Sequence, residues 1–138
     1  TVGKTKEEKK WKQYALEEGF VVSAGTDSTK AIFAWIEYPS REERILHYHL
    51  DKLYVKKGQK VNENTIIGLT GETGKTTGIH LHLGVKKKIN GKDFNKIETK
   101  NHGIYIVLYN ITENYQYKWY RKQPVYETSS DVIIIPKD

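Results

Sequence analysis

Four of the five histidines in this sequence fall into two His-x-His pairs, His47/His49 and His80/His82. Each pair lies in a run of alternating apolar and polar residues, a pattern typical of a β-strand, where side chains alternate between two faces. In the second run, Leu81 separates two imidazoles that the alternation directs to one face. We therefore expect each strand to present two imidazoles. Side by side, the two strands could bind a metal ion or exchange protons.

A plainer explanation exists for either pair taken alone, because polar-face histidines also occur on half-exposed strands that have no function. The presence of two pairs with the same spacing favours the functional interpretation. The chain contains no cysteine, which excludes disulfides, thiolate nucleophiles and cysteine-ligated metals. Any metal site must therefore be built from histidine, carboxylates and water.

The length of 138 residues suits one compact domain, which we expect to occupy residues 1–138. The formal net charge of +6 suits an anionic partner, although a lysine-rich solvated surface explains it more simply. No apolar run is long enough to span a bilayer, and no secretory signal is visible. We therefore expect no membrane span.

The elements that must position the histidines are predicted to be mainly β-strands. Runs rich in β-branched and aromatic residues alternate with glycine-containing turns, as in β proteins. Strands are expected at residues 19–24, 31–38, 44–50, 65–69 and 79–85, and further strands at 104–110, 115–120 and 132–135. The charged segment 4–18 could form one N-terminal helix with a thin apolar stripe.

The motifs around the histidines resemble those of the lysostaphin/LytM family of zinc peptidoglycan endopeptidases. Residues 47–61 resemble the family's tyrosine-x-His-Leu strand and its Val-x-x-Gly-x-x-Val turn. Residues 67–83 resemble its Ile-Gly, Gly-x-Thr-Gly and Gly-x-His-Leu-His signature, in the same order and spacing. The resemblance implies an antiparallel, barrel-like β core over residues 14–90. Residues 91–138 match nothing in that family and are expected to form a C-terminal β extension.

The resemblance also implies roles for the histidines. In such enzymes zinc is held by a histidine and an aspartate of an early His-x-x-x-Asp motif and by the second histidine of His-x-His. His82 would then be the metal ligand, and His49 and His80 would be catalytic. The early motif is missing, because no histidine precedes His47 and no aspartate precedes Asp27, so the zinc site would be incomplete. His47 stands where the family has tyrosine and could rebuild the site as a further metal ligand.

Three explanations for the missing motif stay open. The sequence could be a fragment without its first ligands, the site could be rebuilt with His47, or the domain could have kept the fold and lost catalysis. We favour the last, a non-catalytic module that binds peptidoglycan or a protein partner at the cell envelope. The alternative is an active zinc metalloendopeptidase that cleaves peptidoglycan peptide cross-links. From the resemblance alone we expect an extracellular or envelope location and no nucleic-acid partner.

Other motifs carry less weight. Residues 71–76 suggest a phosphate-binding loop, but the glycine that this loop requires five positions before Gly74 is Leu69. The glycine turn also occurs in lipoyl and biotinyl carrier domains, but such a carrier modifies a lysine at a hairpin tip well upstream, and Lys52 lies too close to the turn. Tyr117 and Trp119 could stack on sugars and bind a glycan. Packing across strands is the commoner role of alternating aromatics in a sheet.

Overall fold

The computed structural model describes residues 10–76, 78–88, 91, 93–96, 125–127 and 131–134. These residues form two antiparallel β-sheets and one short 3-10 helix, η2, at Pro39–Arg41. The prediction of a mainly β fold is therefore confirmed. No helix in this part of the chain is long and apolar enough to cross a membrane.

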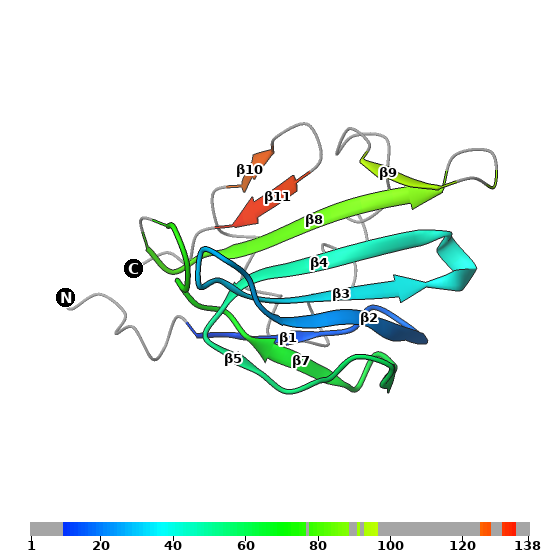
Figure 1. Cartoon of the computed structure of the whole chain (residues 1–138), viewed down its shortest axis with the longest axis horizontal. Coiled ribbons are helices and arrows are strands. Elements are labelled where there is room, and N and C mark those ends of the chain that lie inside the picture. Colours follow the sequence, from blue (N-terminus) through cyan, green and yellow to red (C-terminus); the bar gives the residue numbers. More distant parts are fainter. Residues whose placement is uncertain are drawn as a thin grey trace.

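The large sheet has eight strands in the order β10-β11-β8-β4-β3-β2-β6, with β9 paired to β8 (Figure 1). Its strands are β2 Gly19–Thr26, β3 Ile32–Tyr38, β4 Glu43–Leu50, β6 Lys60–Val61, β8 Leu81–Lys88, β9 Phe94–Lys96, β10 Val125–Glu127 and β11 Asp131–Ile134. The small sheet has three strands in the order β1-β7-β5. They are β1 Lys12–Tyr14, β5 Lys52–Leu53 and β7 Ile66–Leu69. The two histidine-bearing strands, β4 and β8, are direct neighbours.

The strands expected from the sequence between residues 19 and 85 are confirmed as β2, β3, β4, β7 and β8, with ends that differ by up to three residues. The strand expected at 132–135 overlaps β11. The strands expected at 104–110 and 115–120 lie outside the described residues. The short strands β5, β6 and β9 carry too few residues to show a period of their own.

The N-terminal helix expected over residues 4–18 is wrong where the structure describes that segment. Residues 12–14 form strand β1, which pairs with β7. The reason is visible in the burial: Trp11, Gln13 and Ala15 are buried, whereas Lys12 between them is exposed. A period of two is the signature of a strand, and the charged residues around it concealed that period.

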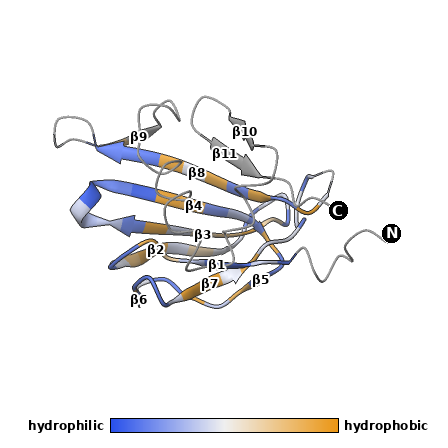
Figure 2. Ribbon diagram, turned by 180° about the vertical axis from the view of Figure 1, so that it is seen from behind, coloured by the Kyte–Doolittle hydropathy of each residue, from blue (hydrophilic) through white to orange (hydrophobic). Residues whose placement is uncertain are grey.

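One hydrophobic core joins the two sheets. Its buried members include Val21, Ile36, Ile45 and Leu83 from the large sheet and Ile67 from the small one. Every second residue of β4 from Glu43 to His49 is buried. Strand β8 is largely hydrophobic before its hydrophilic arrowhead end (Figure 2). Strands β3 and β4 therefore turn one set of side chains into the core and the other set to the outer face.

Candidate metal centre

Strand β8 and the residues before it present two imidazoles on one face. Leu81 and Leu83 are buried in the core, whereas His80 and His82 are half-buried on the opposite side. The centroids of the two imidazole rings lie 5.9 Å apart. The alternation that the sequence predicts for this pair is confirmed.

Strand β4 treats its two histidines differently. The register sets His47 opposite Leu83, so His47 shares the core face, and it sets Tyr48 opposite His82, so Tyr48 shares the outer face. His49 has a φ of 57°, in the left-handed region that interrupts regular strand geometry. Its ring consequently lies on the side of His82, with centroids 5.3 Å apart. The prediction that His47 and His49 face the same way is wrong, because the backbone does not stay extended through His49.

The structure thus brings together three of the four paired histidines. Ligand atoms of His49, His80 and His82 all lie within 4.8 Å of one another. Within the described ranges this is the one group of three or more such side chains close enough to hold a metal ion. His49 is buried and the other two are half-buried, so the cluster is accessible from one side.

Backbone carbonyls fix the orientation of two of these rings. Nδ1 of His49 lies 2.6 Å from the carbonyl oxygen of Thr73, and Nδ1 of His80 lies 2.9 Å from that of Gly78. A carbonyl oxygen can only accept, so each Nδ1 carries the proton and donates it. Each Nε2 is then left with its lone pair, the form in which imidazole binds metal, and a carbonyl partner on the other nitrogen is the usual outer-shell support.

The segment that anchors His49 is itself held tightly. Gly74 adopts a φ of 80°, and a Cβ added there would lie 2.5 Å from the Cβ of Ala31. The hydroxyl of Thr73 donates to the carbonyl of Leu50 at 2.7 Å and accepts the amide N–H of Ile32 at 3.0 Å. The Thr73 carbonyl is therefore fixed relative to both β3 and β4.

Burial favours the neutral form of two of the three imidazoles. Burial lowers the pKa of His49, more strongly than the Thr73 carbonyl and the nearby Asp27 raise it, and His82 and His80 add to the lowering. Burial also lowers the pKa of His80, against the opposing effect of the Gly78 carbonyl. A lowered pKa favours the unprotonated imidazole that a cation requires. The donor set and its charge state therefore fit zinc, which commonly takes histidine nitrogen ligands.

His47 lies apart from this cluster, in the interior. Its Nδ1 lies 2.8 Å from Oε1 of Gln13, whose amide nitrogen donates to the Thr70 hydroxyl at 2.9 Å. This orientation of the amide makes Nδ1 of His47 the donor. Its Nε2 is buried without a hydrogen-bonding partner in the described part of the chain, and burial lowers the pKa of His47 to about 3. This arrangement gives no support to a ligand role for His47, which stays a prediction.

Tyr48 and Asp27 border the cluster, and the sequence reasoning did not identify either. The ring centroid of Tyr48 lies 4.2 Å from that of His49 and 5.6 Å from that of His82. Its hydroxyl donates a short hydrogen bond to Oδ2 of Asp27 in the β2–β3 turn. Only the register of β4 against β8, which sets Tyr48 opposite His82, would have placed Tyr48 beside the cluster, and the sequence alone does not give that register. The expected glycan-binding residues, Tyr117 and Trp119, lie outside the described residues.

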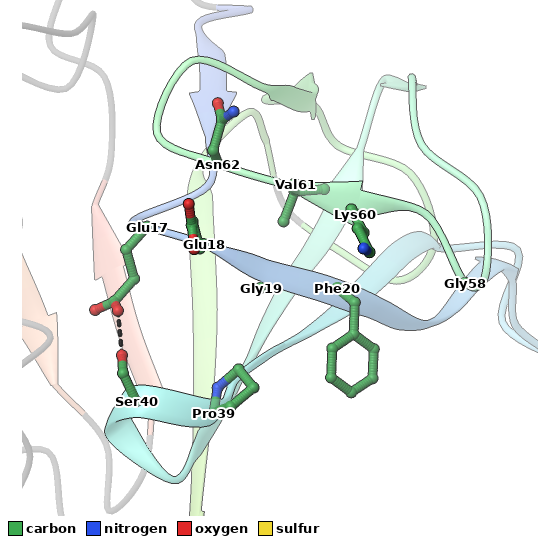
Figure 3. A pocket seen from close by; sticks show the side chains of 10 residues that line it. All are labelled: Glu17, Glu18, Gly19, Phe20, Pro39, Ser40, Gly58, Lys60, Val61 and Asn62. Atoms are coloured by element: carbon green, nitrogen blue, oxygen red, sulfur yellow. Dashed lines mark hydrogen bonds between the residues drawn. The ribbon is translucent and has the colours of Figure 1, made fainter.

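A separate hollow lies beside β2 and β6, away from the histidines (Figure 3). It has a volume of about 830 Å³. Its lining residues are Glu17, Glu18, Gly19, Phe20, Pro39, Ser40, Gly58, Lys60, Val61 and Asn62. Across it, the hydroxyl of Ser40 donates a short hydrogen bond to Glu17 (Figure 3). None of the three clustered histidines lines this hollow, so we assign it no part in the chemistry.

The family model of Peptidase family M23 matches residues 6–96, more than half of the chain. The chain belongs to peptidase family M23. The resemblance to lysostaphin/LytM-type enzymes is thereby confirmed. In this M23 chain the cluster of His49, His80 and His82 is consistent with the zinc of that family.

Curated relatives match short stretches of this M23 chain. Peptidoglycan DD-endopeptidase ShyA of Vibrio cholerae is 58% identical over 36 residues, which are 26% of this chain and 8% of ShyA. Peptidoglycan DD-endopeptidase ShyB of the same organism is 54% identical over 39 residues, 28% of this chain and 9% of ShyB. An uncharacterized metalloprotease of Haemophilus influenzae is 42% identical over 60 residues, 44% of this chain and 12% of that protein. The matched stretches thus span about a tenth of the length of these relatives.

Proposed function

We propose that this chain is a zinc-dependent endopeptidase domain that cleaves peptide cross-links of peptidoglycan at the cell envelope. The observation that carries the proposal is the convergence of three imidazoles, with ligand atoms within 4.8 Å of one another, on the outer face of the large sheet. Membership of family M23 supports it, as do relatives whose names describe peptidoglycan DD-endopeptidases. The net charge of +6 suits an anionic wall.

His49, His80 and His82 would hold the zinc ion. This assignment differs from the family resemblance, which implies that His82 is the ligand and that His49 and His80 are catalytic. The support for it is that the ligand atoms of all three side chains lie within 4.8 Å of one another. When bound, zinc polarises a substrate carbonyl and lowers the pKa of a coordinated water. The carbonyls of Thr73 and Gly78 orient two of the imidazoles by accepting their Nδ1 protons. Because these bonds favour the Nδ1–H tautomer, each Nε2 is ready for a cation without a change of ring orientation.

Cleavage of purified peptidoglycan tests this proposal. Zinc-loaded wild-type protein is expected to release soluble muropeptides with newly freed peptide termini, identified by mass spectrometry. His82→Ala is expected to release none above background, and without metal it is expected to unfold at the same temperature as metal-free wild-type protein. Zinc-loaded wild-type protein that leaves cross-linked peptides intact would contradict the proposal.

A second candidate function is a non-catalytic module that binds the wall or a protein partner there. The observation that favours it is the absence from these 138 residues of a histidine before His47 and of an aspartate before Asp27. In this case the wild-type protein sediments with insoluble peptidoglycan, releases no muropeptides, and His82→Ala binds equally well. Release of muropeptides that depends on His82 decides for the enzyme.

A further inference from the structure

Tyr48 lies between a rigid turn and the histidine cluster. Its ring is tilted by 38° over the ring of His49, and it meets the ring of His82 edge-on at 77°. The centroid distance of 5.6 Å between Tyr48 and His82 lies within the range of favourable aromatic pairs, and the distance of 4.2 Å between Tyr48 and His49 is slightly shorter than that range. Tyr48 therefore contacts two of the three imidazoles, those of His49 and His82, and restricts their movement.

The hydroxyl of Tyr48 is fixed in turn by Asp27. Oδ1 of Asp27 accepts hydrogen bonds from the Thr29 amide at 2.8 Å, the Thr29 hydroxyl at 2.6 Å and the Ala31 amide at 3.2 Å. Oδ2 accepts the hydroxyl proton of Tyr48. Hydrogen bonds from the Thr29 side chain and from Tyr48 lower the pKa of Asp27 to about 2, so the carboxylate stays ionised at neutral pH.

A structural role for Asp27 in the turn explains the hydrogen bonds of only one of its two carboxylate oxygens. An aspartate that caps a turn needs one carboxylate oxygen, and Oδ1 fulfils that task completely. The second oxygen instead binds Tyr48, near the C-terminal end of β4, which is two strands away from β2 in the sheet. It links the turn to the residue that contacts His49 and His82.

We propose that Asp27 and Tyr48 form a positioning pair for the histidine cluster, in which Asp27 holds the Tyr48 hydroxyl and the Tyr48 ring holds His49 and His82 in the arrangement that binds zinc. This inference rests on the proposed function, because it takes from it that the cation bound by the three histidines is zinc. Asp27 acts from outside the cluster, because it does not belong to the group of side chains whose ligand atoms lie within 4.8 Å of one another. Its fixed negative charge further favours a divalent cation nearby.

The experiment is a double-mutant cycle on zinc affinity, measured by titration calorimetry of the full chain with zinc alone. Asp27→Asn and Tyr48→Phe remove the same hydrogen bond from its two ends. Each is expected to weaken zinc binding by roughly tenfold, the scale of an outer-shell defect. The double variant is expected to be little weaker than the worse single variant, because partners in one interaction are not additive. Equal and independent effects in the cycle would overturn the pairing.

Two further readouts separate positioning from a general loss of structure. Cobalt substitution should show an altered visible spectrum in Tyr48→Phe, since that spectrum reports the ligand arrangement, while the thermal unfolding temperature stays within a few degrees. Tyr54→Phe is the matched control, because it removes the same hydroxyl from a tyrosine outside the cluster. Tyr54 is 51% exposed and lies in the loop after β5. A control variant with the same zinc defect would contradict the proposal.

Failure of the proposed function can be told apart from failure of this inference. If wild-type protein binds no zinc, the proposed function fails, and crystal structures of the metal-free variants still test the positioning. In that case Tyr48→Leu should separate or disorder the His49 and His82 rings, which lie 5.3 Å apart in the wild-type protein. An unchanged ring arrangement in Tyr48→Leu would overturn the inference.

Discussion

The two His-x-His pairs have the same spacing and lie on neighbouring strands, yet the fold uses them differently. The pair at β8 keeps both imidazoles on the outer face, as regular alternation requires. The pair on β4 divides, with His47 buried in the core and His49 turned out to the cluster. The difference originates at one residue, because the φ of 57° at His49 reverses the face to which its side chain belongs.

This comparison shows where a periodic pattern stops being informative. Alternation assigns faces only while the backbone stays extended. At the end of β4 the chain must turn toward β5, and the left-handed residue that begins this turn also delivers an imidazole to the site. His47, still in regular strand, follows Ile45 into the core and takes Gln13 as its partner. The two histidines of β4 therefore have different roles although their spacing matches that of the second pair: His47 packs in the core, and His49 belongs to the cluster.

The largest expected difference between the two histidine pairs is in zinc affinity. His82→Ala should weaken zinc binding by more than roughly 100-fold, beyond the range of outer-shell changes, because it removes a nitrogen ligand. His47→Gln should change zinc affinity by less than about threefold, because His47 lies outside the group of ligand atoms. Titration calorimetry of both variants measures the contrast. A comparable loss in His47→Gln would restore the ligand role that its burial argues against.

The next effect concerns acid stability. In the folded protein the pKa of His47 is about 3, whereas an unfolded histidine has a pKa of about 6.5. Above pH 6.5 both states are neutral and no penalty arises. As the pH falls below 6.5, His47 becomes protonated in the unfolded state but stays neutral in the folded state. The free energy of unfolding therefore falls with pH until about pH 3, where the folded state also becomes protonated. Between pH 7 and pH 5 this one group should cost up to about 2 kcal/mol.

Urea unfolding of wild-type protein and of His47→Gln at several pH values measures this contribution. The lowered pKa values of His49 and His80 act in the same direction and remain in both proteins. The difference between the two pH profiles therefore isolates His47. Parallel profiles would mean that the imidazole is protonated in the fold, with its Nε2 paired to a group beyond the described residues.

Most of the fold could be predicted from the sequence, as could the positions of three of the four paired histidines in one cluster. The long strands were readable because their β-branched runs carry a clear period of two, and the convergence of His49, His80 and His82 followed from the resemblance. The strand β1 was missed because lysines and glutamates surround its short alternation. The fate of His47 could not be read, since it depends on Gln13, 34 residues away, on the other sheet. Tyr48 and Asp27 were missed for the same reason, because their contact is set by register.

The third prediction tests the left-handed residue itself. Asparagine tolerates a positive φ, whereas the branched Cβ of valine does not. His49→Val should therefore be less stable than His49→Asn by about 1–2 kcal/mol, although both variants lose the imidazole. Urea unfolding in the absence of metal, where ligation makes no contribution, measures the difference. Equal stability would show that β4 can continue as regular strand through position 49.

The smallest expected effect distinguishes how the two outer-face imidazoles are anchored. The anchoring carbonyl of Thr73 belongs to a residue whose hydroxyl makes two backbone hydrogen bonds, to Leu50 and from Ile32. Among the described residues, the hydroxyl of Thr76 makes backbone hydrogen bonds only to Gly78, two residues along the chain, donating to its carbonyl at 3.1 Å and accepting its amide N–H at 3.5 Å. It also lies 3.2 Å from Nδ1 of His80, but that nitrogen already donates to the Gly78 carbonyl at 2.9 Å. Thr73→Val should therefore cost about 1–2 kcal/mol of stability and Thr76→Val less than about 0.5 kcal/mol. Because valine keeps the shape of threonine in both cases, thermal or urea unfolding of the two variants compares the hydroxyls alone. A larger loss in Thr76→Val would mean that the side chain, and not the backbone carbonyl, holds the ring of His80.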